Sequence, residues 1–311
     1  MSRCVAIFLT IAAVILQSSA AVAATFTPPA RGTVYTGSLD VAVDKKIPLP
    51  PGEWILVGYE MRKNNSRVPF FRPQLIQVKG NVVTGLIEAN VQADAGNSVG
   101  NWGDGYVLNQ SCYKANTIHQ KMIANGENRE QDCWGVNHFL MTNDGKDLDV
   151  NERYEYIKKH NLILPVNMIK VGFHFAFKQP NFLDVSYGFN PEAEGFGPPT
   201  NAGWAESDWH KDRYYADPKK VEFINKLISW GEATHDRVKE GFLGKLNVAN
   251  QIPSPFAAVA TAPAASAPAA ASNAAPLNIE GRMKEAEGLF QKKLITQEEY
   301  DKKRKEILSG L

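Results

Sequence analysis

An Ala-, Pro- and Ser-rich stretch without a charged residue, 251–278, divides this chain into two unequal parts. Such a composition offers too few large apolar side chains to build a core, so we expect an extended linker there. The part before it, 25–250, is long enough for one substantial hydrophobic core. The part after it, 279–311, falls below the roughly 40 residues that usually fold without disulfides, metals or a partner. The sequence therefore predicts one folded domain, a linker and a small appended module.

The first 24 residues have the features of a secretory signal peptide. Arg3 supplies an early positive charge, residues 5–16 form an apolar run, and an Ala-x-Ala site follows at 21–23. An uncleaved anchor is the alternative, but the run is shorter than the roughly 20 residues that span a bilayer. We therefore expect residues 1–24 to be removed, no integral membrane segment after cleavage, and a periplasmic or secreted location.

Two cysteines, Cys112 and Cys133, follow the predicted cleavage site. An even pair in an exported protein most often forms a disulfide, because that compartment is oxidising. The alternatives are a reactive thiol pair or half of a metal site, and neither has the supporting C-x-x-C spacing. We predict a disulfide between Cys112 and Cys133.

Opposite charges nearly balance in this chain, with Lys+Arg 34 against Asp+Glu 33 and a formal net charge of +1. The balance also holds within the folded part and within the tail. A strongly basic face is therefore not expected, and binding to nucleic acid lacks its electrostatic basis. We expect no nucleic-acid partner.

Strand patterns dominate the first half of the folded part. Residues 171–178 alternate strictly between Val or Phe and smaller or polar residues, which is the period of a half-buried strand. The segments 67–78 and 82–91 flank Gly80-Asn81, a typical hairpin turn. Further strands are predicted at 33–43, 53–60 and 183–189.

Two helices are predicted in the second half. Asp217 followed by Pro218 is typical of a helix start, and the apolar positions after it form one stripe that ends near Gly241. Asp149, with Glu152 three positions on, predicts a shorter helix with a capping box. The predicted fold class is α+β, a mainly antiparallel sheet with the long C-terminal helix packed on it.

Catalytic and cofactor motifs are not recognisable in the sequence. The segment 96–100 matches G-x-S-x-G, but the residues after it are typical of a loop and not of the required helix. The histidines lack the local spacing of a zinc site. The oxygen-rich segment 143–152 lacks the spacing of a calcium loop, so it is either a polar turn or an irregular cation site. We expect no cofactor and no metal, and the question of enzyme activity stays open.

Two places in the folded part contain candidate ligand-binding residues. His174 has the small neighbours Gly172 and Ala176, which either leave a cleft over it or allow it to pack with hydrogen bonds, and the second interpretation is favoured. The aromatic segment 203–215 either binds a flat ligand such as a carbohydrate or anchors itself on the core. The candidate residues are His174, Asp184, Trp204, Asp208 and Trp209.

Residues 279–311 predict a helical hairpin. Apolar residues step by three or four positions from Ile279 to Leu294, and Thr296 with Glu299 then restarts a helix with a capping box. Because this hairpin is too small to bury its apolar stripes alone, we expect a protein partner or self-association. The residues expected at that contact are Met283, Phe290, Leu294, Ile295, Tyr300 and Ile307.

The segment Leu294-Ile295-Thr296-Gln297-Glu298-Glu299-Tyr300, with Lys303 and Ile307-Leu308 after it, resembles the short C-terminal domain called SHOCT over about 280–308. This resemblance implies a bacterial module appended to unrelated domains, with a role in interaction or oligomerisation. The folded part, through 129–138 and 182–191, resembles uncharacterised exported proteins of proteobacteria. That second resemblance implies a single domain in the cell envelope.

Two functional hypotheses follow from the sequence. The first is an exported, non-enzymatic envelope protein whose tail binds a partner. The second is a periplasmic enzyme or small-ligand binding protein that uses the folded part.

Overall fold

The computed structural model describes residues 26–64, 67–93, 112, 117–125, 130–177, 181–199, 203–247, 252–256, 287, 300–301 and 304–305. The chain divides into two compact units, 1–258 and 259–311. All the strands and the two long helices named below lie in the first unit. The predicted signal peptide, the segment 96–100, most of the linker and nearly all of the hairpin lie outside the described residues.

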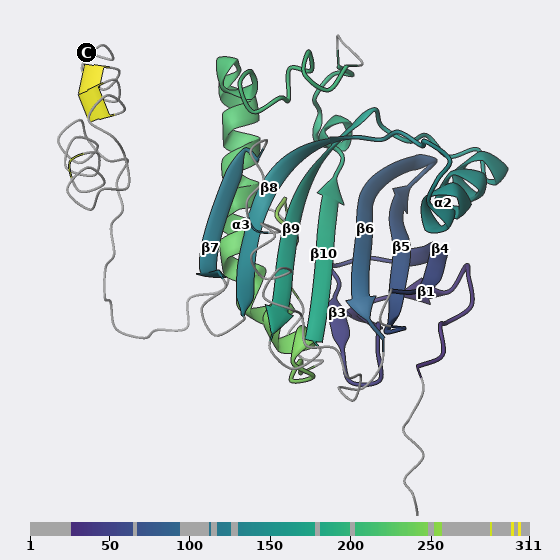
Figure 1. Cartoon of the computed structure of the whole chain (residues 1–311). Helices are drawn as coiled ribbons and strands as arrows, with labels where there is room; N and C mark the ends of the chain where they lie inside the picture. Colours follow the sequence, from purple (N-terminus) through teal and green to yellow (C-terminus); the bar gives the residue numbers. More distant parts are fainter. Residues whose placement is uncertain are drawn as a thin grey trace, which may run out of the picture. The chain divides into compact units, whose positions relative to one another are not determined.

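The first unit is built on an antiparallel sheet of eight strands in the order β1-β4-β5-β6-β10-β9-β8-β7 (Figure 1). A separate two-stranded sheet pairs β2 with β3. The strands are β1 (Val34–Tyr35), β2 (Ser38–Asp40), β3 (Lys46–Pro48), β4 (Trp54–Lys63), β5 (Pro69–Lys79), β6 (Val82–Gln92), β7 (His119–Asn125), β8 (Gln131–Leu140), β9 (Asn167–Phe177) and β10 (Asn181–Phe189). The prediction of an α+β fold with a large antiparallel sheet is confirmed.

The turn between β5 and β6 is formed as predicted. Lys79 lies opposite Val82, so Gly80 and Asn81 connect the two strands directly. Gly80 has a φ of 63°, the left-handed conformation that glycine adopts at little steric cost.

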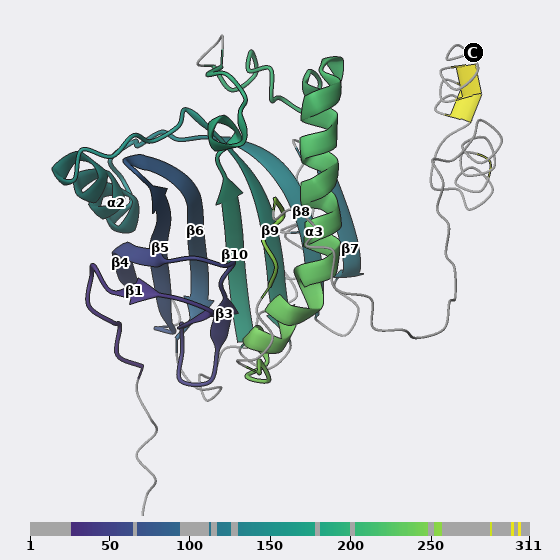
Figure 2. The same ribbon diagram turned by 180° about the vertical axis from the view of Figure 1, so that it is seen from behind.

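One face of the sheet is covered by the long helix α3 (Pro218–Phe242), which Figure 2 shows in front of the strands. Its start is as predicted, because the Asp217 side chain accepts a hydrogen bond from the Lys219 backbone N–H at 2.9 Å. The Phe175 ring stacks on Phe242 at 5.3 Å, and the Phe173 ring lies 6.3 Å from Trp230. The alternating phenylalanines of β9 therefore point to α3.

The opposite face carries the shorter helix α2 (Leu148–Lys159), beside β4 and β5. The prediction that Asp149 caps this helix is wrong: Asp147 is the N-cap residue, and its side chain makes no capping hydrogen bond. Asp149 is instead buried in the first turn, where it accepts a hydrogen bond from Gln74 of β5 at 2.7 Å. The Asp149 side chain, which local spacing assigns to the cap, therefore binds Gln74 on the sheet instead.

The first residues of the predicted linker pack on the core. Ile252 is fully buried, the Trp230 indole N–H donates to the Pro253 carbonyl at 2.6 Å, and the Phe256 ring stacks on Phe223 at 4.9 Å. The 3-10 helices η2 (Pro191–Glu194) and η3 (Tyr214–Ala216) complete the first unit. No helix within the described residues is long and apolar enough to cross a membrane.

Candidate functional site

The sheet face opposite α3 is polar in the middle of the strands. Because successive side chains of a strand alternate between faces, residues that pair directly across neighbouring strands point to the same side. One such row runs Gly58, Gln74, Glu88, Ser186, Gly172, Gly135 and Gln120. A neighbouring row runs Asn90, Asp184, His174 and Cys133. The antiparallel register thus gathers polar side chains from strands far apart in the sequence.

A cleft of about 390 Å³ lies over these two rows. The start of α2, with Asp147 and Asp149, lines one side of it, and the disulfide and Gln120 of β7 line another. Clefts that hold small ligands commonly measure about 300–1,000 Å³. The cleft therefore has the size of a small-molecule site.

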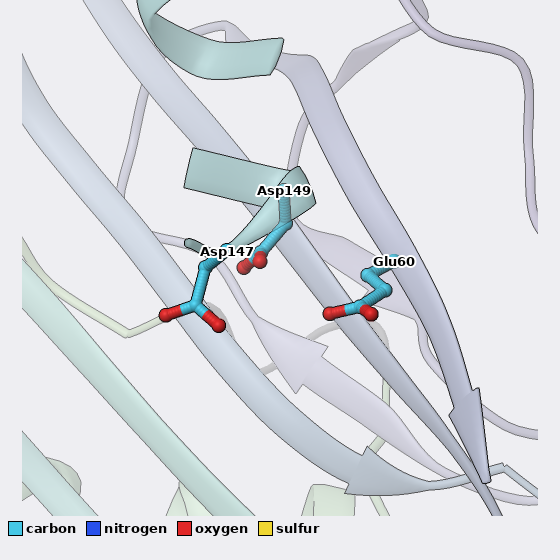
Figure 3. Close-up of side chains that lie close together, drawn as sticks. All are labelled: Glu60, Asp147 and Asp149. Atoms are coloured by element: carbon cyan, nitrogen blue, oxygen red, sulfur yellow. The ribbon is translucent and has the colours of Figure 1, made fainter. Parts of the chain in front are cut away.

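On the α2 side of the cleft, Arg72 forms ion pairs with three carboxylates. Arg72 Nη1 donates to Glu60 at 3.1 Å and to Asp147 at 3.0 Å, and its Nη2 lies 3.6 Å from Asp149 Oδ1. Figure 3 shows the three carboxylates converging from β4 and α2. Burial raises the pKa of Asp149 above its usual range, although Gln74 and Arg72 act in the opposite direction.

The same three carboxylates also satisfy the distance criterion for a cation site, since one oxygen from each lies within 4.8 Å of the others. Arg72, however, already places its guanidinium against all three. A divalent ion would have to displace that cation or lie beside it. The carboxylate cluster and Arg72 therefore form an ion-pair network between α2 and the sheet.

A second buried network continues toward β9. Arg153 of α2 is almost fully buried and donates to Gln74 at 2.6 Å and to Glu88 at 2.5 Å. Lys170 of β9 donates to the other oxygen of Glu88. Burial alone would raise the pKa of Glu88, but the two cations outweigh it and lower that pKa to about 2. Glu88 therefore remains charged over the physiological pH range.

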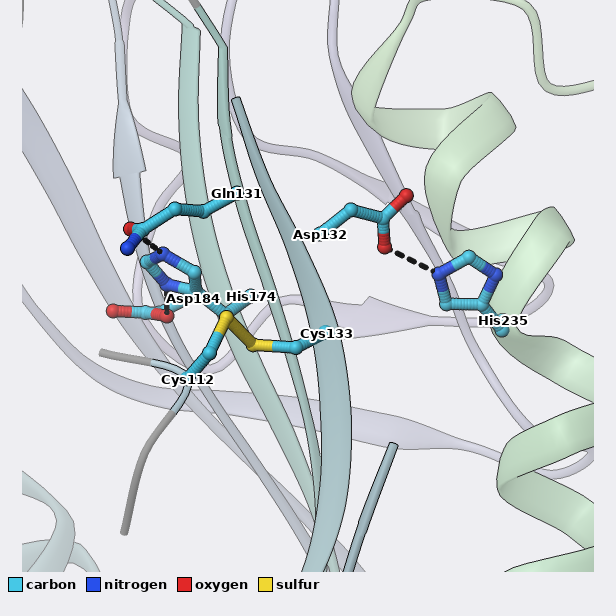
Figure 4. Close-up of a disulfide and its surroundings, with 7 residues drawn as sticks. All are labelled: Cys112, Gln131, Asp132, Cys133, His174, Asp184 and His235. Carbon is cyan, nitrogen blue, oxygen red and sulfur yellow. Dashed lines mark hydrogen bonds and ion pairs between the residues drawn. A yellow bond between two sulfur atoms is a disulfide. The ribbon is translucent and has the colours of Figure 1, made fainter. Parts of the chain in front are cut away.

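The opposite side of the cleft contains His174 and the disulfide (Figure 4). His174 Nδ1 lies 2.5 Å from Asp184 Oδ1, and its Nε2 lies 2.9 Å from Gln131 Oε1. The predicted disulfide is confirmed: Cys112 is bonded to Cys133, which lies directly opposite His174 on the next strand. His174 is thus both buried with hydrogen bonds and part of the cleft wall.

Glycine and small residues leave the floor of the cleft open. A Cβ added to Gly172 would find its nearest neighbours only at 3.9 Å, which is ordinary van der Waals contact. Around this floor, the half-buried side chains of Asn90, Asn137 and Ser186 make no hydrogen bond within the described part of the chain. Polar groups that are partly withdrawn from water without a protein partner are the groups that a bound ligand can satisfy.

The predicted ligand-binding residues fall in two places. His174 and Asp184 come together in the cleft. Trp209 is buried against Phe196 and Phe223. Trp204 donates to the His138 carbonyl at 3.3 Å, and Asp208 forms an ion pair with Lys220. These last three do not line the cleft, so the structure does not join them with His174 into one site.

Several residues of the cleft were not identified from the sequence: Arg72, Gln74, Glu88, Asn90 and Ser186 line it, and Arg153 and Lys170 support it through Glu88. Their only local signal is the polar half of the alternating pattern, in pairs such as Glu88 and Asn90 two positions apart. Such pairs are also typical of a solvated strand face. The pairing register between strands was needed to see that they converge.

No protein-family model matches the sequence, and no curated protein matches it. Two solved structures with partial similarity are transcriptional regulators. The first is a GntR-family regulator from Enterococcus faecalis V583, at 11% identity and a TM-score of 0.22 over 44% of this chain and 87% of that chain. The second is the possible regulator YydK from Bacillus subtilis subsp. subtilis str. 168, at 11% identity and a TM-score of 0.22 over 48% of this chain and 61% of that chain. Similarity at this level supports no conclusion about fold or function.

Proposed function

We propose that the folded domain binds a small polar molecule in the cleft on the sheet face opposite α3. The observation that carries the proposal is the set of half-buried polar side chains without a hydrogen-bond partner among the described residues, placed around a floor opened by Gly172. The buried networks of Glu88 and Arg72 support the cleft walls and hold them rigid. Rigid, pre-formed walls reduce the conformational entropy that the protein loses when a ligand binds.

Binding is favoured over catalysis by the state of His174. Both of its ring nitrogens already lie within hydrogen-bond distance of protein side chains, those of Asp184 and Gln131, so neither is left for a direct contact with a substrate. The Asp184 carboxylate is 48% exposed, and it is better placed to contact a ligand. His174 then orients Asp184.

The proposal is tested by filling the cleft floor. Gly172→Val adds a side chain where the backbone leaves open space, and it should abolish the binding of any ligand found by screening a panel of small polar metabolites with the full-length protein. Gly197→Val is the matched control, because Gly197 also has open space around its Cβ position and does not line the cleft. Equal binding by Gly172→Val and the unmodified protein would contradict the proposal.

We propose further that the protein works in the cell envelope. The support is the signal-peptide pattern of residues 1–24 together with a disulfide, which is stable in an oxidising compartment. Fractionation and N-terminal sequencing of the native protein test this. A mature chain that begins near Thr25 in the envelope is expected, and a cytoplasmic chain that retains Met1 would contradict it.

The tail, 279–311, is proposed to bind a protein partner or a second copy of the chain. Its support is the pair of apolar helical stripes in a segment too short to bury them alone. The solution mass and the captured partners of the mature protein should differ between the full chain and a chain that ends at Asn278. A monomer in both cases, with no captured partner, would contradict this role.

A further inference from the structure

The charges that line the cleft are unequal among the described residues. Glu88, Asp147, Asp149 and Asp184 are negative and Arg72 is positive, while Arg153 and Lys170 oppose them only through their ion pairs with Glu88. Each of these cations is already engaged: Arg72 with the carboxylates beside α2, and Arg153 and Lys170 with Glu88. An anionic ligand would therefore meet excess negative charge and, in this part of the chain, no uncommitted cation.

Among these carboxylates, Asp184 faces the open cleft and keeps one oxygen atom available as a hydrogen-bond acceptor. His174 contacts its Oδ1, and its Oδ2 has no hydrogen bond among the described residues. Asn90 lies directly opposite it on β6, and Ser186 lies two residues along β10 on the same face. Side chains paired in this way have Cβ atoms about 4.5–5.5 Å apart.

The three side chains together offer a carboxylate, an amide and a hydroxyl oxygen on one face of the neighbouring strands β6 and β10. A primary ammonium group has three N–H donors and no acceptor, so it matches a set of three oxygen acceptors. Its positive charge also offsets Asp184, whose other oxygen is held by His174. An uncharged hydroxyl has a single O–H donor, so it would match neither the three acceptors nor the charge.

Resting on the cleft-binding function proposed above, we infer that the cleft selects a small organic cation, whose primary ammonium group contacts Asp184, Asn90 and Ser186. A divalent metal ion is the less suitable occupant, because Arg72 already lies against the carboxylates beside α2 and Asp184 has only neutral neighbours besides His174. A zwitterion is also disfavoured, since its carboxylate would lack a cationic partner among the described residues.

The inference is tested by calorimetry on the full-length, disulfide-bonded protein with four ligands that share a four-carbon skeleton. These are 1,4-diaminobutane, 4-aminobutyrate, 1,4-butanediol and succinate. The diamine should bind tightest, and succinate should not bind. Asp184→Asn should weaken diamine binding about tenfold or more, the loss typical of a charge-assisted hydrogen bond. The control Asp40→Asn removes an exposed carboxylate that pairs with Lys46 outside the cleft, and it should leave binding unchanged.

Four outcomes overturn the inference: no diamine binding at millimolar concentration, equal binding of the diol or of succinate, no effect of Asp184→Asn, or binding of calcium in place of amines. The Gly172→Val variant tests the proposed cleft-binding function separately from the ammonium inference. If a neutral or anionic ligand binds and is lost in Gly172→Val, the cleft-binding function stands and only the ammonium inference fails. If Gly172→Val leaves all binding intact, the cleft-binding function fails as well.

Discussion

Asp132 lies on the opposite side of β8 from Gln131 and Cys133, where it is buried beneath α3 (Figure 4). Its two oxygens accept hydrogen bonds from His235 Nε2 and from Lys239 Nζ, each at 2.7 Å. Burial alone would raise the pKa of Asp132, but these two partners outweigh it and lower that pKa. Burial likewise opposes the charge on His235, yet the hydrogen bonds to Asp132 and Asp236 raise its pKa.

Asp132→Asn should lower the free energy of unfolding by about 3 kcal/mol, because it leaves two cations near the core without their counter-charge. The matched control is Asp236→Asn. Asp236 also contacts His235, at 3.0 Å, but its carboxylate is 91% exposed, so the change should be small. Urea unfolding of the three proteins measures the difference. Equal losses in the two variants would contradict the role assigned to the buried pair.

The stabilisation by this pair should depend on pH in two directions. A raised pKa means that the contribution of His235 is complete below its ordinary value of 6.5 and disappears as the pH rises through the folded-state pKa. A lowered pKa means that the contribution of Asp132 is complete above 3.8 and disappears as the pH falls through its folded-state pKa. The difference in free energy of unfolding between the unmodified protein and Asp132→Asn should therefore be largest between pH 3.8 and 6.5. A difference that does not change with pH would contradict the roles assigned to Asp132 and His235.

At the scale of elements, Gly58 and Gly172, which lie in one cross-strand row, have different structural roles. A Cβ on Gly58 would lie 2.8 Å from the Asp149 carbonyl oxygen and 2.8 Å from Glu152 Cβ, so glycine allows α2 to approach β4. Gly172 faces the open cleft and has no neighbour closer than 3.9 Å. The same residue type therefore permits helix packing at one end of the row and leaves a cavity near the middle.

Gly58→Ala should lower the free energy of unfolding by about 1–3 kcal/mol, because α2 must move away from the sheet to admit the methyl group. Gly172→Ala is its control in the same row, and it should change stability little. Thermal unfolding of both variants measures the effect. The opposite order of stabilities would contradict the proposed packing of α2.

At the scale of the whole molecule, the disulfide connects Cys112 to β8, the neighbour of the edge strand β7, across a sequence separation of 21 residues. Closing a loop of this length in the unfolded chain is worth about 3 kcal/mol by loop entropy. The double variant Cys112→Ser, Cys133→Ser should therefore unfold at lower denaturant concentration than the oxidised protein. Reductant should lower the midpoint of the unmodified protein to the same value and leave the variant unchanged. A variant as stable as the oxidised protein would contradict the disulfide's stabilising role.

The parts of this fold that sequence predicted are those governed by local rules. The Asp217-Pro218 start of α3, the Gly80 turn and the alternating phenylalanines of β9 each depend on residues a few positions apart. The disulfide followed from the number of cysteines and the inferred compartment. The prediction of the α2 N-cap failed because Gln74, 75 positions earlier in the chain, binds the side chain that local spacing had assigned to the cap.

The sequence by itself determined the α+β class and the cysteine pair, because composition and short-range periodicity carry that information. Only the tertiary structure decided that Asn90, His174 and Asp184 meet over an open floor, and that Trp204 and Asp208 lie elsewhere. Convergence of this kind depends on the order and register of β6, β10, β9 and β8. Those are set by long-range pairing and by the burial of the face beneath α3, which no local pattern in the chain specifies.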